Sequence, residues 1–188
     1  EYAHKIGRED TFSPVDVGVY FGSPGKTVGD PYFDGKGPDR TGCILCGGCM
    51  VGCPHNAKNT LMKNYLYLAE NLGVTILPEH ETVDIQNNSG GYDVHIRKTT
   101  GMFNPTKILH CTKLIVSGGV MGTVKLLFKC REKGSLPDLS NQLGNYVRTN
   151  SEAIIGTSSF KIPPGIDYTK GIAISAGFHP DENTKIET

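Results

Sequence analysis

The chain has 188 residues, enough for one large domain or two small ones, and its 24 glycines and 37% hydrophobic content indicate a loop-rich soluble protein. Nineteen basic and nineteen acidic residues cancel and neither sign forms a block, which argues against nucleic-acid and anionic-membrane partners. No apolar run approaches the ~20 residues needed to cross a bilayer and no signal peptide opens the chain, so no membrane span is expected.

The first part of the chain is rich in turn-forming residues. Residues 1–42 carry prolines and glycines throughout, with one expected strand in the alternating run VDVGVYFG at 15–22. Residues 59–72 place apolar side chains at steps of three and four, which predicts a helix that ends at Gly73. A strand is expected in VTIL at 74–77. The runs ETVDI at 81–85 and YDVHI at 92–96 flank QNNSGG, and this order predicts a β-hairpin.

The second part continues the alternation of strands and helices. A short buried strand is expected at 114–116, followed by a glycine turn and a helix over about 120–129. Residues 134–152 indicate a loop or short helix. An alternating β pattern resumes from EAIIGTSSFKI at 152–162 to GIAISAG at 171–177. The order of helix, strand, hairpin, strand and helix predicts an α/β fold, or a mixed α+β one.

The most specific motif is GCILCGGCMVGCPHNAKN at 42–59. Four of the six cysteines fall here in the pattern C-x2-C-x2-C-x3-C-P, which is typical of bacterial ferredoxins. These candidate metal ligands are Cys43, Cys46, Cys49 and Cys53. In two-cluster ferredoxins the fourth cysteine of such a run binds the other cluster. A single [4Fe-4S] cluster would therefore need Cys53 to fold back, or a remote ligand such as Cys111 or Cys130.

Two other interpretations of the cysteines stay open. Zinc also binds four thiolates, although two residues between the C-x2-C pairs is a tight spacing for a structural zinc site. Alternatively, the cysteines are buried or disulfide-linked and only shape a loop. Close spacing suits metal ligation better than long-range disulfides, which favours a reducing compartment, and cytoplasm is the expected location.

A second candidate site lies at the glycine turn. Ser117, Gly118 and Gly119 stand between the expected strand and helix, where backbone N–H groups and a helix N-terminus could hold a phosphate. Many such turns carry glycine only for packing, so the signal is weak alone.

Taken in order, the motifs resemble a known family. CGGCMVGCPHNAKNTLMKNYLYLAENLGVTILPEHETV, then GGYDVHIRK, then LIVSGGVMGTVKLLFKCREKGSLPDLSNQLGNYVRTNSEA are similar to the bacterial cholesterol-oxidase-like branch of the glucose–methanol–choline (GMC) flavin oxidoreductases. The resemblance covers about residues 12–160 and is strongest over 43–152. It implies an internal fragment, because the family's G-x-G-x-x-G motif lies upstream and its catalytic His and Asn lie downstream.

The resemblance also implies a domain organisation and a cofactor. Residues 59–150 resemble the middle segment of the FAD-binding domain, whereas 1–58, with the cysteine-rich loop 43–54, and 151–188 resemble pieces of the β-rich substrate domain. Val83 corresponds to the strand whose backbone meets the adenine of FAD, and the turn 117–119 to the family's glycine turn beside the dinucleotide. No catalytic residue is assigned, and we expect this chain alone to bind FAD weakly or not at all.

Three functions follow as hypotheses. The first is an FAD-dependent enzyme that oxidises a sterol or other bulky apolar alcohol by hydride transfer to the flavin, with this fragment itself inactive. The second is an iron–sulfur electron-transfer module built on the four cysteines. The third is a binding or scaffolding domain without a cofactor.

Overall fold

The computed structural model describes residues 1–148, 150–156 and 158–188. Contacts divide the chain into two compact units, Glu1–Thr75 with Thr157–Thr188 as the first and Ile76–Gly156 as the second. Helices and antiparallel strands occur together, so the expected mixed α+β content is confirmed.

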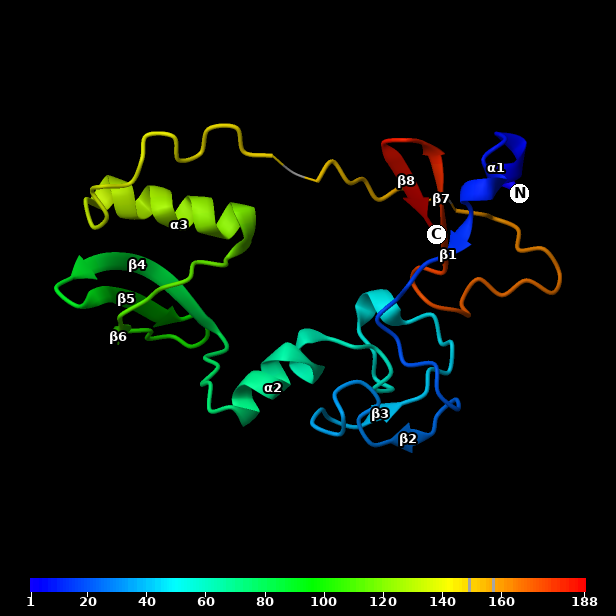
Figure 1. Ribbon diagram of the computed structural model, residues 1–188, viewed down its shortest axis with the longest axis horizontal. Helices are drawn as coiled ribbons and strands as arrows, with labels where there is room; N and C mark the ends of the chain where they lie inside the picture. The colour runs from blue at the N-terminus through cyan, green and yellow to red at the C-terminus, as the bar shows by residue number, and fades with distance from the viewer. Residues whose placement is uncertain (149, 157) are drawn as a thin grey trace. The chain divides into compact units, whose positions relative to one another are not determined.

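The second unit is a three-stranded antiparallel meander with one helix beside it (Figure 1). Its strands are β4 (His80–Asn88), β5 (Gly91–Lys98) and β6 (Thr106–Cys111), in that order across the sheet. The predicted hairpin is confirmed, because Asn88 pairs with Gly91 at its end. The Asn88 side chain accepts the backbone N–H of Gly90 at 2.8 Å, so the turn residues close the turn themselves.

Helix α3 (Gly119–Lys133) contains the predicted helix 120–129 and extends beyond it. It ends at Gly134, whose left-handed φ of 72° favours glycine. Ile85, Val94 and Ile96 are buried on one face of the sheet, and Cys130 of α3 is completely buried. Alternation along β5 turns Val94 and Ile96 to the same side, which gives this unit its small apolar core.

The first unit joins the two ends of the chain. It opens with α1 (Tyr2–Lys5), a 3-10 turn at Glu9–Thr11 and β1 (Ser13–Pro14). Strand β1 pairs with β7 (Ala176–Asp181), which forms a hairpin with β8 (Thr184–Glu187). The Tyr2 and Phe178 rings meet edge to face with centroids 5.9 Å apart, so an aromatic contact supports this end.

The rest of the first unit carries the cysteine-rich loop. Strands β2 (Thr27–Val28) and β3 (Arg40–Thr41) form a two-stranded ribbon that leads into the loop. Two 3-10 turns follow, Cys49–Val51 and Leu61–Lys63, and then helix α2 (Tyr65–Asn71). The loop is thus bounded by regular elements on both sides.

Four sequence expectations differ from the structure. The predicted strands 15–22, 74–77 and 114–116 belong to no ladder among the described residues, and Val19 makes only an isolated bridge to Lys58. An apolar run becomes a strand only where another strand pairs with it. The α/β order that these strands implied is therefore absent. The predicted helix 59–72 begins as a helix only at Tyr65, because Asn64 leaves the helical conformation and caps Tyr65.

The β pattern expected over 152–177 is also wrong for most of its length. Residues 152–156 and 158–162 lie outside the strands, and β7 begins only at Ala176. The part of the prediction that falls on residue 157 lies outside the described residues. The compact units divide the chain at 75/76 and 156/157. The predicted segments 1–58, 59–150 and 151–188, with the roles assigned to them, stay predictions.

Candidate functional site

The predicted glycine turn lies at the start of α3. Gly118 is the N-cap residue and Gly119, with a φ of 68°, begins the helix. A Cβ on Gly118 would stand 3.4 Å from the backbone nitrogen and hydroxyl of Thr123, an ordinary van der Waals contact, so the turn lies beside the first helical residues. The first backbone N–H groups of a helix lack partners within the helix, which makes this end suitable for an anion.

A cavity of about 450 Å³ opens beside this turn, between β4 and α3. Its volume lies in the range of small-molecule sites. The lining includes Thr82, Ser117, Gly118, Lys125 and Lys129. Two lysines one helical turn apart, together with the N-terminus of α3, make this wall electropositive. Two of the four predicted cofactor residues, Ser117 and Gly118, thus line one cavity.

Val83, another predicted cofactor residue, lies in an irregular part of β4. The register of β4 on β5 shifts between Thr82 and Asp84, so Val83 has no partner residue across the ladder. Its carbonyl instead accepts a hydrogen bond from Lys133 Nζ at 3.4 Å. Thr82 lines the cavity beside it, which places the bulge at the cavity wall. Whether Val83 and the turn bind a nucleotide stays a prediction.

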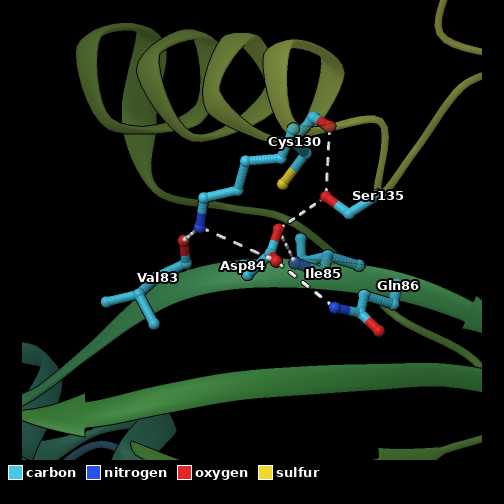
Figure 2. A network of polar contacts seen from close by, with 7 residues as sticks. Val83, Asp84, Ile85, Gln86, Cys130 and Ser135 are labelled. Atoms are coloured by element: carbon cyan, nitrogen blue, oxygen red, sulfur yellow. Dashed lines mark hydrogen bonds and ion pairs between the residues drawn. The ribbon is translucent and has the colours of Figure 1, made fainter.

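A buried carboxylate links the bulge to the end of α3 (Figure 2). Asp84 is 8% exposed and accepts a hydrogen bond from Ser135 Oγ at 2.6 Å. Its other oxygen lies 3.4 Å from Gln86 Nε2 and 3.7 Å from Lys133 Nζ. Burial alone would raise the pKa of Asp84, but hydrogen bonds from Ser135, Gln86 and Cys130 and the Lys133 charge lower it below its usual value.

The cysteine-rich loop folds around a second, much smaller cavity. Cys43, Cys46, Cys49 and Cys53 all line this cavity of about 10 Å³. The predicted set therefore comes together, although the cavity has room for little more than one water molecule. His55 and Lys58 line it as well.

Backbone N–H groups point at two of these sulfurs. Cys43 Sγ accepts from the N–H of Leu45 at 3.3 Å, and Cys53 Sγ accepts from the N–H of Lys58 at 3.4 Å. Burial raises the pKa of Cys53, but backbone N–H groups around Lys58 and the Lys63 charge outweigh it and lower that pKa. The loop thus stabilises negative charge on sulfur.

A segment far away in sequence holds the loop in place. The N–H of Gly47 donates to Gly171 O at 3.1 Å, and the N–H of Gly171 donates to Leu45 O at 2.9 Å. Gly47 has a φ of 72°, and a Cβ there would lie 2.3 Å from Thr169 O. Only glycine fits this close approach.

The six cysteines are free thiols, and no group of three or more His, Cys, Asp or Glu in the described ranges converges on a single metal position. Cys111 and Cys130, named above as possible remote ligands, belong to the second unit, and the cysteine-rich loop belongs to the first. Cys130 is instead completely buried, and burial raises its pKa.

Sequence reasoning missed a buried arginine next to the loop. Arg40 is 0% exposed, and its guanidinium donates to Asn59 Oδ1 at 2.9 Å and to the carbonyl of Lys63. No carboxylate within the described ranges pairs with it, and its Nε has no hydrogen-bond partner. Asp84 and Lys133 were also missed. The signal for Asp84 was a charged residue inside an apolar strand, V-D-I.

No helix in the described part of the chain is both long and apolar enough to cross a membrane. No family model matches the chain, and no solved structure matches it.

Curated relatives do match. The whole chain aligns, over 194 alignment positions including gaps, with proteins named cholesterol oxidase from two strains of Mycobacterium tuberculosis, CDC 1551 / Oshkosh and ATCC 25618 / H37Rv. The identity to each is 45%. It is 42% identical to a cholesterol oxidase from Acinetobacter baumannii, with 97% of the chain aligned. The chain spans 34% of the length of each of these relatives. The predicted resemblance is therefore confirmed, and the chain corresponds to about a third of a cholesterol-oxidase-like protein.

Proposed function

We propose that this chain is part of an FAD-dependent oxidoreductase of the GMC type that oxidises an alcohol. The observation that carries the proposal is its 45% identity, along its whole length, to proteins named cholesterol oxidase. When bound, FAD accepts the hydride that the alcohol loses. The chain's own part is to bind and orient that cofactor, and no catalytic residue is assigned to it.

The proposed cofactor-binding residues are Val83, Ser117, Gly118 and Gly119, on the adenine and pyrophosphate side of FAD. Three features support them. The 450 Å³ cavity accommodates a ligand of this size class. The N-terminus of α3, with Lys125 and Lys129 on the same wall, suits the negative pyrophosphate. The bulge at Val83 provides backbone groups that are not paired with β5.

The proposed substrate is a sterol or another bulky apolar alcohol, following the names of the relatives. We propose that residues 1–58 and 151–188 contribute to the substrate domain. In support, most of both segments lies in the same compact unit although residues 59–150 separate them in sequence. A cytoplasmic location is proposed as well, because all six cysteines are free thiols.

The test uses the gene product that contains this chain, purified with FAD. We expect stoichiometric flavin and anaerobic bleaching of its absorbance by cholesterol, with much slower bleaching by ethanol. Gly118→Val, which places a branched side chain at the cavity wall, should lower the flavin content, whereas Gly29→Ala, at a position with open space, should not. Absence of flavin, or bleaching by no alcohol, would contradict the proposal.

A second candidate function, an iron–sulfur electron-transfer site, rests on a separate observation. The four cysteines of the ferredoxin-like run line one cavity, and two of them accept backbone N–H groups. Ligands of one zinc ion must all lie about 2.3 Å from a single point, whereas each cysteine of a cluster binds a different iron. We propose that Cys43, Cys46, Cys49 and Cys53 bind a [4Fe-4S] cluster, for which the small cavity would have to widen.

Iron, acid-labile sulfide and zinc per chain, measured after anaerobic purification, test this second proposal. We expect about four irons and four sulfides per chain. Cys49→Ser should remove most of the iron, whereas Cys111→Ser, outside the C-x2-C-x2-C-x3-C run, should leave it unchanged. Zinc without sulfide, or free thiols without metal, would refute the cluster.

A further inference from the structure

We propose that Asp84, Lys133 and Ser135 are positioning residues for the nucleotide. Together they hold the bulge at Val83 against the end of α3 and so fix the adenine side of the large cavity. This inference rests on the proposed function, because it requires the cavity to bind FAD.

The bulge is the part of β4 that needs support. Val83 has no partner residue on β5, because the register shifts between Thr82 and Asp84. Residues in the ladder are held by their neighbours, whereas a bulged residue depends on other contacts. Thr82 and Ile85, on either side of the bulge, both line the cavity. The conformation of the bulge therefore shapes the wall.

Lys133 supplies one of these contacts. Its ammonium lies 3.4 Å from Val83 O and 3.7 Å from Asp84 Oδ2, so one cation joins two consecutive residues of the bulge. A carbonyl held in this way fixes the direction of its peptide plane, and hence the direction of the next N–H group. Lys133 belongs to the last turn of α3, where a cation is also favoured by the helix dipole.

Ser135 supplies the other contact. Its hydroxyl lies 2.6 Å from Asp84 Oδ1 and 3.1 Å from the carbonyl of Cys130. Each Asp84 oxygen is thus joined to the C-terminal end of α3, one by Ser135 and one by Lys133. Cys130, completely buried, anchors the helix at this level.

The same helix carries the opposite wall of the cavity. The N-cap residue Gly118 and the α3 residues Lys125 and Lys129 line it. A helix of 15 residues moves as a rigid body. The contacts of Lys133 and Ser135 with Asp84 at its C-terminal end therefore set the position of this wall relative to β4. The three residues therefore control the cavity without lining it.

If Asp84, Lys133 and Ser135 only stabilised the fold, their substitution would have a different effect. Loss of these contacts would then lower the melting temperature and reduce the affinity for every ligand equally. A positioning role at the adenine side predicts selective weakening of ligands that contain adenine. FAD and ADP contain adenine, whereas FMN carries only the flavin half.

The test compares Lys133→Met and Ser135→Ala with the parent protein, in the gene product that contains this chain. Dissociation constants for FAD, ADP and FMN are measured by titration calorimetry, and the melting temperature by circular dichroism. We expect affinity for FAD and ADP to fall about tenfold, the effect of one hydrogen bond to a charged group, and affinity for FMN to stay unchanged. Lys133→Arg should restore binding.

Asp93→Asn provides the matched control. This carboxylate is paired with His110 at 2.7 Å on the same sheet but lines no part of the cavity. An equal loss of affinity for FAD and FMN, or a lower melting temperature with unchanged ADP affinity, would overturn the positioning role and leave the proposed function intact. A parent protein that binds neither FAD nor ADP would refute the proposed function too.

Discussion

Replacement of Arg40 by methionine tests how the cysteine-rich loop is held. The side chain is 0% exposed, and its two long-range hydrogen bonds reach Asn59 Oδ1 and the carbonyl of Lys63. Methionine would fill much of the space but would leave both acceptors without their donor. Because these acceptors connect β3 to the turn before α2, we expect the first unit to lose stability.

The magnitude follows from the number of bonds and the unpaired charge. A hydrogen bond to a charged group contributes about 1.5–3 kcal/mol, so the two long-range bonds together contribute about 3–6 kcal/mol. Removing a buried charge that has no carboxylate partner offsets part of this loss. A net loss of about 3 kcal/mol corresponds to a melting temperature lower by about 6–12 °C for a chain of this size.

The assay is thermal and urea unfolding followed by circular dichroism. Arg8→Met is the matched control, because the half-buried Arg8 side chain donates a single hydrogen bond within the described part of the chain, to His179 O at 2.9 Å, and its loss should change stability by less than about 1 kcal/mol. Asn59→Asp should stabilise the protein by giving Arg40 a carboxylate. A stability of Arg40→Met within about 1 kcal/mol of the parent would refute the reasoning.

Three further changes have expected outcomes. Gly47→Ala should destabilise the first unit by more than about 1 kcal/mol, since its Cβ would lie 2.3 Å from Thr169 O at a φ of 72°, whereas Gly29→Ala, in open space, should be neutral in the same urea titration. Ile85→Ala, at a position 2% exposed, should lower the free energy of unfolding by about 2–5 kcal/mol. The lowered pKa of Asp84 means that its stabilising contribution is present above about pH 4 and lost as the pH falls through its folded pKa. The advantage of the parent over Asp84→Asn in urea unfolding should therefore shrink below pH 4, and an advantage that does not change with pH would contradict this assignment.

The elements that the sequence predicted well are those whose partners are close in the chain. The hairpin of β4 and β5 forms because its turn residues and its alternating strands agree, and α3 forms because its apolar residues meet that sheet. The runs at 15–22, 74–77 and 114–116 have strand-like composition, but composition does not supply a paired strand. Ile115, in the last of these runs, is 87% exposed, so its apolar side chain is not buried against a neighbouring strand.

A candidate site could be predicted from the sequence where the spacing of its residues is typical of one kind of site. Cys43, Cys46, Cys49 and Cys53 line one cavity, because short intervals leave a loop few ways to direct them, whereas metal binding by them stays a prediction. The cavity beside Ser117 and Gly118 needed more than the glycine turn, since part of its wall comes from β4, about 30 residues earlier in the chain. No local pattern marks such a meeting of distant segments.

The residues that hold the candidate sites in place were hardest to predict, because each does so through one or two hydrogen bonds or ion pairs that no sequence pattern marks. Lys133 and Ser135 look like ordinary residues at the end of a helix, yet each reaches one oxygen of Asp84. Arg40 looks like a surface residue in a turn-rich segment, yet it is buried and donates to the Lys63 carbonyl in the turn before α2. In each unit one buried charged residue, Arg40 in the first and Asp84 in the second, holds the backbone beside the candidate site. Such residues show only in the folded chain, because burial, and not residue type, gives their hydrogen bonds their strength.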